Sequence, residues 1–335
     1  MRKYSGPAGL IHRVSIDSRA LRGNLLGDPA TRLVDVYIPQ GHSGRGLALL
    51  VDLVGFTGSG LSHTGWAAFQ ENVPERLDRL IGEGRMPAVA VAFPDCFTRL
   101  GGNQYINSAA MGPWEDYLIE EMLPAIEQRF GCGGTGRRGV FGKSSGGYGA
   151  IVHALLHPDV WSASACHSGD MGFEWCYLPD MPRALLGLAK SGNSIERWWT
   201  ELEAARKHPE GAGDVFNILA MAASYDPDPT QYLGMRLPVT LDTCELIPER
   251  WNNWLRHDPL VLLESKSANL RRLKALYIDC GTTDQFRLLY GARRFARRLG
   301  QLGIAHRYDE FDDNHSGIDY RMDESLPYIA RALTD

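Results

Sequence analysis

Residues 139–150 constrain the fold of this 335-residue chain more than any other segment. They contain a G-x-S-x-G pattern, in which Ser144 stands between Gly142 and Gly146. The residues before this pattern resemble the end of a short strand, and the residues after it resemble a helix that begins with small side chains. Serine hydrolases hold their nucleophile on such a strand–turn–helix, where glycine on both sides leaves room for the turn. The pattern predicts that Ser144 attacks a carbonyl carbon.

Strand and helix patterns on both sides of this motif predict an α/β fold. Residues 9–18 and 32–39 alternate between apolar and polar side chains and predict an antiparallel pair of strands. Residues 47–54 and 88–93 are apolar nearly throughout, as in strands that are buried on both faces of a parallel sheet. Later strands are expected at 163–167, 273–280 and 305–311, and helices at 114–130, 286–302 and 325–333. We therefore expect an α/β fold, with a mostly parallel central sheet and helices on both faces.

Residues 171–257 interrupt this rhythm and are expected to form a cap. They hold five of the eight tryptophans and seven prolines, and they show no strand period. The fold core would then comprise residues 1–170 and 258–335, and the insertion would be a helical and looped cap over the C-terminal edge of the sheet, where open α/β folds bind ligands. Its aromatic side chains are candidates to line a pocket for an acyl or aryl group, and the alternative is that they form the core of the insertion itself. The candidates are Trp175, Trp198, Trp199 and Trp251.

A serine nucleophile needs a general base and an acid that orients this base. In the α/β-hydrolase order, the acid and then the histidine follow the serine along the chain. His315 lies in a short polar loop after the last expected strand, and it is the expected base. Asp284 follows the preceding strand and a turn, and it is the expected acid. If Asp284 only caps the next helix, Asp279 is the alternative acid.

The tetrahedral intermediate needs two backbone N–H groups that stabilise its oxyanion. One is expected from Ser145, the residue after the nucleophile, and the other from Phe56, because Gly55 lets the backbone turn towards the site. Thr57 and Lys143 are further candidates for substrate contacts, although the Lys143 side chain could equally be solvated.

Composition excludes several other classes of function. The hydrophobic content is 44% and the charged content 22%, and the net charge of −5 gives no electrostatic case for nucleic acid or an anionic membrane. No apolar run is long enough to span a bilayer, and the basic N-terminus has no apolar stretch behind it, so a cytoplasmic location is expected. The six cysteines form no C-x-x-C pair, so we expect free thiols, no metal and no cofactor. The expected partner is a small-molecule ester or thioester substrate, and a homo-oligomer is an open alternative.

Together these segments resemble the α/β-hydrolase superfamily. Within it they are similar to the esterase D group, which includes S-formylglutathione hydrolases, enterochelin and feruloyl esterases and the antigen 85 mycolyltransferases. The resemblance rests on residues 36–39, 55–57, 141–150, 157–159, 168–169 and 281–286, and on His315. It implies the α/β-hydrolase fold and the triad Ser144, Asp284 and His315. The chain departs from many relatives at Val54, where they carry histidine before the glycine.

The function expected from the residues and from the resemblance is that of a serine carboxylic-ester hydrolase, which forms an acyl-enzyme on Ser144. Two alternatives share the same fold. One is an acyltransferase that uses the same triad with another acceptor, and the other is a binding module that has kept the fold without catalysis.

Overall fold

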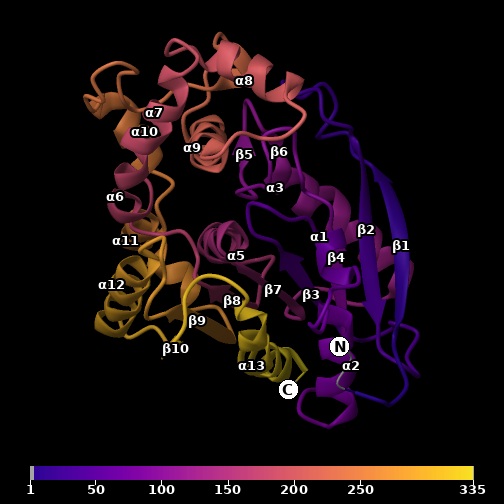
Figure 1. The fold of residues 1–335 in the computed structure, drawn as a ribbon. Helices are drawn as coiled ribbons and strands as arrows, with labels where there is room; N and C mark the ends of the chain where they lie inside the picture. Colours follow the sequence, from indigo (N-terminus) through magenta and orange to yellow (C-terminus); the bar gives the residue numbers. More distant parts are fainter. Residues whose placement is uncertain (1–3, 335) are drawn as a thin grey trace.

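A computed structural model describes residues 4–334 of the chain (Figure 1). Its centre is an eight-stranded sheet in the order β1-β2-β4-β3-β7-β8-β9-β10. Strand β2 runs antiparallel to β1 and β4, and the remaining neighbours are parallel. The strands are β1 (Leu10–Asp17), β2 (Thr31–Ile38), β3 (Ala48–Leu53), β4 (Val89–Pro94), β7 (Arg138–Lys143), β8 (Ala163–His167), β9 (Ala275–Gly281) and β10 (Arg307–Phe311). The predicted fold class is confirmed. Residues 1–3, which entered the expectation about targeting, lie outside the described range.

The apolar strands occupy the middle of the sheet because both of their faces are covered. Every residue of β3, β4, β8 and β9 is buried. Strand β1 lies at an edge, and its exposed and buried residues alternate along the second half of the strand. These patterns are the ones that buried parallel strands and a half-exposed edge strand are expected to show.

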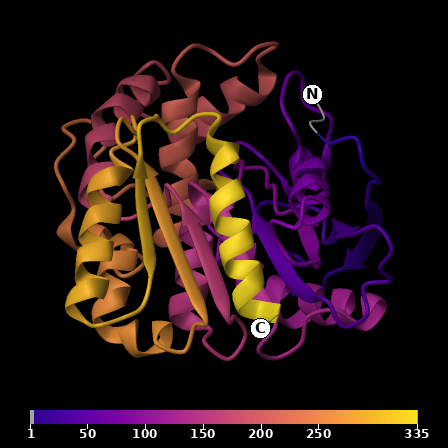
Figure 2. The ribbon, with the colours of Figure 1, turned by 90° about the horizontal axis from the view of Figure 1, so that it is seen from below.

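Helices cover the two faces of the sheet and form two separate apolar clusters. On one face lie α2 (Val73–Gly82) and α13 (Met322–Thr334), and Figure 2 shows α13, in yellow, in front of the strands. The other face carries α5 (Ser145–Leu156), α11 (Pro259–Leu270) and α12 (Leu288–Gln301). No helix within residues 4–334 combines the length and apolar character that a bilayer crossing requires.

The helix predicted over residues 114–130 is interrupted by a wider turn. The segment begins as α3 (Trp114–Asp116), continues as a π-helix (Tyr117–Met122) and ends as α4 (Leu123–Phe130). The Leu123 N–H donates to the carbonyl of Leu118, five residues earlier. Pro124 has no N–H with which to continue the usual four-residue pattern, which accounts for the change at this point.

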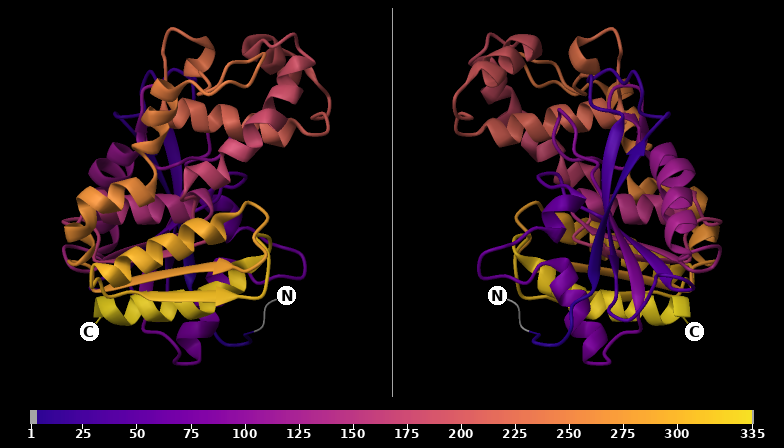
Figure 3. Two further views of the ribbon diagram at one scale, coloured as in Figure 1. Left: turned by 90° about the vertical axis from the view of Figure 1, so that its left-hand side faces the viewer. Right: turned by 90° about the vertical axis from the view of Figure 1, so that its right-hand side faces the viewer.

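Residues 171–257 are mostly helical. They form α6 (Phe173–Cys176), α7 (Met181–Ala189), α8 (Ile195–Ala204), α9 (Ala212–Tyr225) and α10 (Pro248–Leu255), with short 3₁₀ turns at Leu178–Asp180 and Tyr232–Gly234. Figure 3 shows these helices together on the side of the molecule away from α13. The insertion shares one apolar cluster with α5 and the sheet, and Tyr148 of α5 contacts the rings of Phe173 and Tyr225.

A second segment, which the sequence does not predict, joins the insertion. The short strands β5 (Asn107–Ser108) and β6 (Gly112–Pro113) form a hairpin beside α9 (Figure 1). The Ser108 hydroxyl donates to the carbonyl of Ala223 at 2.5 Å. We call the insertion together with this hairpin the roof.

Candidate active site

Ser144 lies on a strained turn between β7 and α5. Its backbone has φ 57° and ψ −125°, and a positive φ is uncommon for a residue other than glycine. Such a conformation costs about 1–3 kcal/mol and persists only where the surroundings hold it. Here the Ser144 N–H donates to the His167 carbonyl at 2.9 Å, and the Ser144 carbonyl accepts from the Tyr148 N–H at 2.8 Å. The predicted strand–turn–helix is present, and it holds the serine at the ends of β7 and β8.

The two glycines of the motif allow the turn to pack against β3. A Cβ atom on Gly146 would lie 1.7 Å from the carbonyl oxygen of Leu53, and one on Gly142 would lie 2.3 Å from the same oxygen. Real Cβ atoms do not approach backbone oxygens this closely. Because Leu53 ends a fully buried strand, the oxygen has little freedom to retreat.

Replacing Gly146 with alanine should therefore destabilise the protein by about 3 kcal/mol, or prevent folding, because the new methyl group overlaps the backbone of β3. Urea unfolding measures the effect. Gly300→Ala is the matched control, because Gly300 is a helical glycine whose Cβ would meet no atom within 4 Å. That variant should gain about 0.5–1 kcal/mol from helix propensity. Equal stability of the two variants would contradict the packing argument.

His315 and Asp284 form a buried pair beside this turn. The His315 Nδ1 lies 2.8 Å from Asp284 Oδ2, and the two residues are 7% and 8% exposed. The other carboxylate oxygen of Asp284 accepts the N–H of Phe286 at 2.9 Å. Asp284 thus binds the histidine with one oxygen and the following backbone turn with the other. The Gln285 side chain accepts the His315 N–H at 2.9 Å, which fixes the loop that carries the ring.

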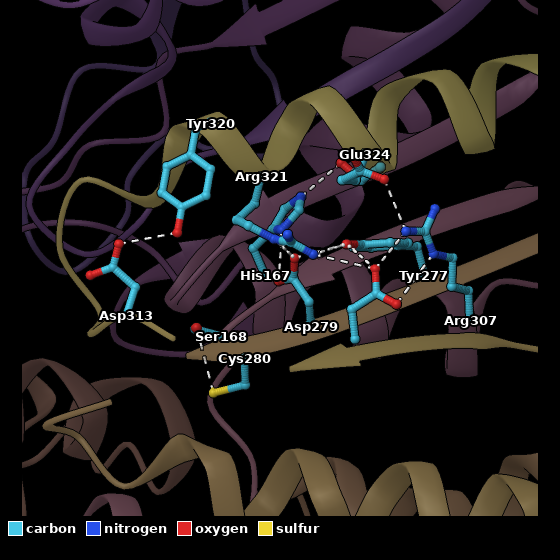
Figure 4. A network of polar contacts seen from close by, with 12 residues as sticks. His167, Ser168, Tyr277, Asp279, Cys280, Arg307, Asp313, Tyr320, Arg321 and Glu324 are labelled. Carbon is cyan, nitrogen blue, oxygen red and sulfur yellow. Dashed lines mark hydrogen bonds and ion pairs between the residues drawn. The ribbon is translucent and has the colours of Figure 1, made fainter. Parts of the chain in front are cut away.

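Asp279, the alternative acid, lies in a different network (Figure 4). It faces His167 across the β8–β9 register, with Oδ1 2.8 Å from the His167 Nδ1, and Oδ2 accepts from Arg321 Nε at 2.9 Å. Burial alone would raise the pKa of Asp279, but the neighbouring His167 and Arg321 lower it below its ordinary value. Asp279 therefore binds His167 and Arg321, and it does not contact His315.

The same network contains a second Ser-His-Asp arrangement. The His167 Nε2 lies 2.8 Å from the hydroxyl of Ser325, so Ser325, His167 and Asp279 form a connected row. All three residues are buried, and none of them lines the cavity that holds Ser144. These three residues have the contacts of a triad, but a substrate cannot reach them because they are buried. Their hydrogen bonds link β8, β9 and α13.

A cavity of about 690 Å³ brings most of the predicted residues together. Its lining includes Ser144, His315, Phe56, Ser145, Thr57 and Lys143. Five predicted residues lie outside this lining: Asp284, which is buried against His315, and the four tryptophans. Trp198 and Trp199 in α8 and Trp251 in α10 are buried in the roof, and Trp175 packs against Tyr290 and Arg294 of α12. For the three buried tryptophans the structure shows the alternative, in which these side chains form the core of the insertion.

The backbone at Phe56 is held close to Ser144. The Gly55 carbonyl accepts the Gly58 N–H at 3.0 Å, which fixes the peptide unit that carries the Phe56 N–H. The Phe56 carbonyl accepts from Gly102 at 2.6 Å. A Cβ on Gly55 would lie 3.4 Å from the Ser144 Cβ, so the loop touches the serine. Within residues 4–334, the N–H groups of Phe56 and Ser145 make no backbone or side-chain hydrogen bond, which leaves both free to bind an oxyanion.

Two further titratable groups line the cavity, and the sequence reasoning missed both. The His63 Nδ1 lies 2.6 Å from the fully buried Asp52. Burial would lower the pKa of His63, but the Asp52 carboxylate outweighs burial and raises it. Asp170 follows β8, and burial raises its pKa to about 6. Asp52 could have been found as the one charged residue in an apolar strand, whereas no sequence pattern marks His63 or Asp170.

Lys143 faces this cavity from the end of β7. Burial lowers the pKa of its ammonium group, and the nearby carboxylate of Asp319 opposes that effect. In the described part of the chain, no carboxylate lies within 4 Å of the Lys143 ammonium group. The Lys143 side chain is therefore half-buried at the edge of the cavity rather than fully solvated.

Comparisons with known proteins agree with this architecture. Residues 30–323 match the family described as "Putative esterase". A ferulic acid esterase superposes with a TM-score of 0.62 at 18% identity, covering 98% of this chain and 100% of the other. The S-formylglutathione hydrolase of Agrobacterium tumefaciens gives 0.59 at 17%, and the fluorophosphonate-binding serine hydrolase F of Staphylococcus aureus gives 0.57 at 16%, each with 98% of both chains covered.

These structural likenesses concern the fold, and the family match spans most of the chain. The resemblance predicted from the sequence motifs is confirmed. The chain belongs to this esterase family, and it is an ester hydrolase built on the α/β-hydrolase fold.

Proposed function

We propose that this esterase hydrolyses carboxylic esters through an acyl-enzyme on Ser144, with His315 as the general base and Asp284 as the residue that orients it. The observation that carries the proposal is the 2.8 Å contact between Asp284 and the Nδ1 of His315, a residue that lines the same cavity as Ser144 on its strained turn. With Nδ1 bound to the carboxylate, Nε2 is the nitrogen left to take the serine proton.

The reaction follows from these positions. The His315 Nε2 accepts the hydroxyl proton of Ser144 while Oγ forms a bond to the ester carbonyl carbon. Asp284 stabilises the imidazolium that results, and the N–H groups of Phe56 and Ser145 bind the oxyanion. The proton then passes to the departing alcohol as the ester C–O bond breaks. Water, deprotonated by the same histidine, attacks the acyl-enzyme and releases the acid. Loss of one oxyanion donor typically costs about 3 kcal/mol of transition-state stabilisation.

Covalent labelling tests the nucleophile directly. A fluorophosphonate should form a single adduct, located on Ser144 by peptide mass spectrometry, because the activated hydroxyl displaces fluoride from phosphorus. Ser144→Ala should remove the adduct.

Ser325→Ala is the matched control for this labelling. Ser325 also contacts a histidine that is held by an aspartate, but it is buried away from the cavity. Labelling of Ser144 should persist in this variant. An adduct on Ser325, or no adduct in the native protein, would overturn the assignment of the nucleophile.

A further inference from the structure

Asp170 is a buried carboxylate at the reacting centre that the triad does not use. It follows β8 in the segment Ser168-Gly169-Asp170, lines the cavity and is only 7% exposed. Its Oδ2 accepts the Tyr177 hydroxyl at 2.9 Å and lies 3.5 Å from the Ser145 Oγ. Because Ser145 directly follows the nucleophile, Asp170 is close to the place where the ester carbonyl would bind.

This carboxylate forms no ion pair within residues 4–334, although a charged His315 would favour its ionised form from beyond 4 Å. Within residues 4–334, no lysine, arginine or histidine nitrogen lies within 4 Å of it. Its other oxygen, Oδ1, accepts no hydrogen bond from these residues, and the residue lines the cavity. A buried carboxylate without a counter-ion is costly, and the two hydroxyl contacts offset only part of that cost.

The remaining charges of the cavity differ in how they are compensated. Asp180 is paired with Arg287 at 2.8 Å, and His63 is already held by Asp52. Lys143 and Asp319 lie near each other and offset one another's charge. Of the buried carboxylates that line the cavity within residues 4–334, Asp170 is therefore the one without an ion-pair partner, since Asp180 is paired with Arg287.

We infer that Asp170 binds a cationic group of the substrate, so that the enzyme prefers esters carrying an ammonium group a few bonds from the scissile carbonyl. This inference rests on the proposed function, since it concerns the same cavity and the same nucleophile. A bound ammonium group supplies the missing counter-charge on the cavity side of the carboxylate. Aliphatic esters of the same shape lack this interaction and leave the carboxylate desolvated and unpaired.

Two p-nitrophenyl esters of equal shape test the inference. In 4-(trimethylammonio)butanoate the terminal group is cationic, and in 5,5-dimethylhexanoate a carbon atom replaces the nitrogen. The native enzyme should show a kcat/KM at least about tenfold higher for the cationic ester, because a desolvated charge pair is worth at least that factor. This ratio is measured on the native protein and does not depend on the folding of any variant.

Asp170→Asn should reduce the cationic-to-neutral ratio to near one, since the amide keeps the size and the hydroxyl contacts but loses the charge. Asp319→Asn is the matched control, because it removes one carboxylate from the same cavity beside Lys143. It should change the ratio by less than about threefold. An equal fall in both variants would assign the preference to the general field of the cavity and overturn the role of Asp170.

Two further outcomes also decide the matter. A native enzyme that hydrolyses both esters at equal rates contradicts the inference and leaves the proposed function intact. A native enzyme that hydrolyses neither ester and takes no fluorophosphonate adduct refutes the proposed function, and the inference about Asp170 falls with it.

Discussion

Alanine at Ser144, at His315 or at both positions should lower kcat for a p-nitrophenyl ester by nearly the same factor, about 10⁴ or more. The reason is that the two side chains act in one step: the serine is a weak nucleophile without its base, and the base has no proton to take without the serine. Independent residues would instead lose activity as the product of the two single factors. Steady-state rates of the two single variants and the double variant measure this directly.

His63→Ala is the matched control for this experiment. His63 is a second cavity histidine whose Nδ1 is held by a buried aspartate, at 2.6 Å from Asp52. It should retain at least about 100-fold more activity than His315→Ala if only His315 serves as the base. A His63 variant as inactive as the His315 variant, or losses that multiply in the double variant, would contradict the proposed roles.

Asp279→Asn should destabilise the protein by about 3 kcal/mol, because it leaves the buried His167 and the half-buried Arg321 without the carboxylate that they share. Strand register places Asp279 between His167 of β8 and Asp309 of β10. Arg321 also donates to the Tyr277 hydroxyl at 2.8 Å, so the loss affects several contacts of Figure 4 at once. Urea unfolding at pH 7 measures the difference in the free energy of unfolding.

Glu324→Gln provides the control at the rim of the same network. Glu324 contacts Arg307 at 2.9 Å, but its side chain is 44% exposed, so its replacement should cost less than about 0.5 kcal/mol. The pKa of Asp279 is lower in the folded protein than in the unfolded chain, where it has its ordinary value of about 4. Its contribution to the free energy of unfolding is therefore fully present above about pH 4, and it is lost as the pH falls through the folded pKa. The gap between native protein and Asp279→Asn should therefore narrow below about pH 4. Equal stability of the two variants at pH 7 would contradict the importance of the network.

The sheet could be predicted because its strands carry their own signal. Alternation in β1 and continuous apolar runs in β3 and β4 reflect how many faces of each strand are buried. In β2 the alternation marks a strand but not its burial, because the polar Asp35 is buried together with its apolar neighbours. The π-helix at Tyr117–Met122 could not be predicted from apolar spacing, because that spacing is nearly the same in a regular helix and the change depends on Pro124. The hairpin of β5 and β6 has too few residues to show any period.

The candidate site also contains residues that the sequence could predict and residues that it could not. Ser144, Asp284 and His315 follow a fixed order at the ends of recognisable strands, so their positions could be named before their contacts were known. Asp170 and His63 meet the cavity only through the path of the folded backbone, and no local pattern distinguishes them from other polar residues. For the tryptophans, a visible sequence pattern led to more than one interpretation. Aromatic residues in an insertion suit a ligand pocket and a hydrophobic core equally well, so the sequence could not distinguish the two.

The aromatic contact between Tyr148 of α5 and the roof residues Phe173 and Tyr225 limits how this enzyme can acquire new specificity. Tyr148 lies one helical turn beyond Ser144, and its N–H holds the carbonyl of that serine. Exchanging the roof for that of another hydrolase would therefore disturb the packing of α5, the helix that follows Ser144. Substitutions on the cavity side of α9 offer a simpler route to new substrates. There Asn217 and Asp214 line the cavity and take no part in the ring contacts of Tyr148, Phe173 and Tyr225.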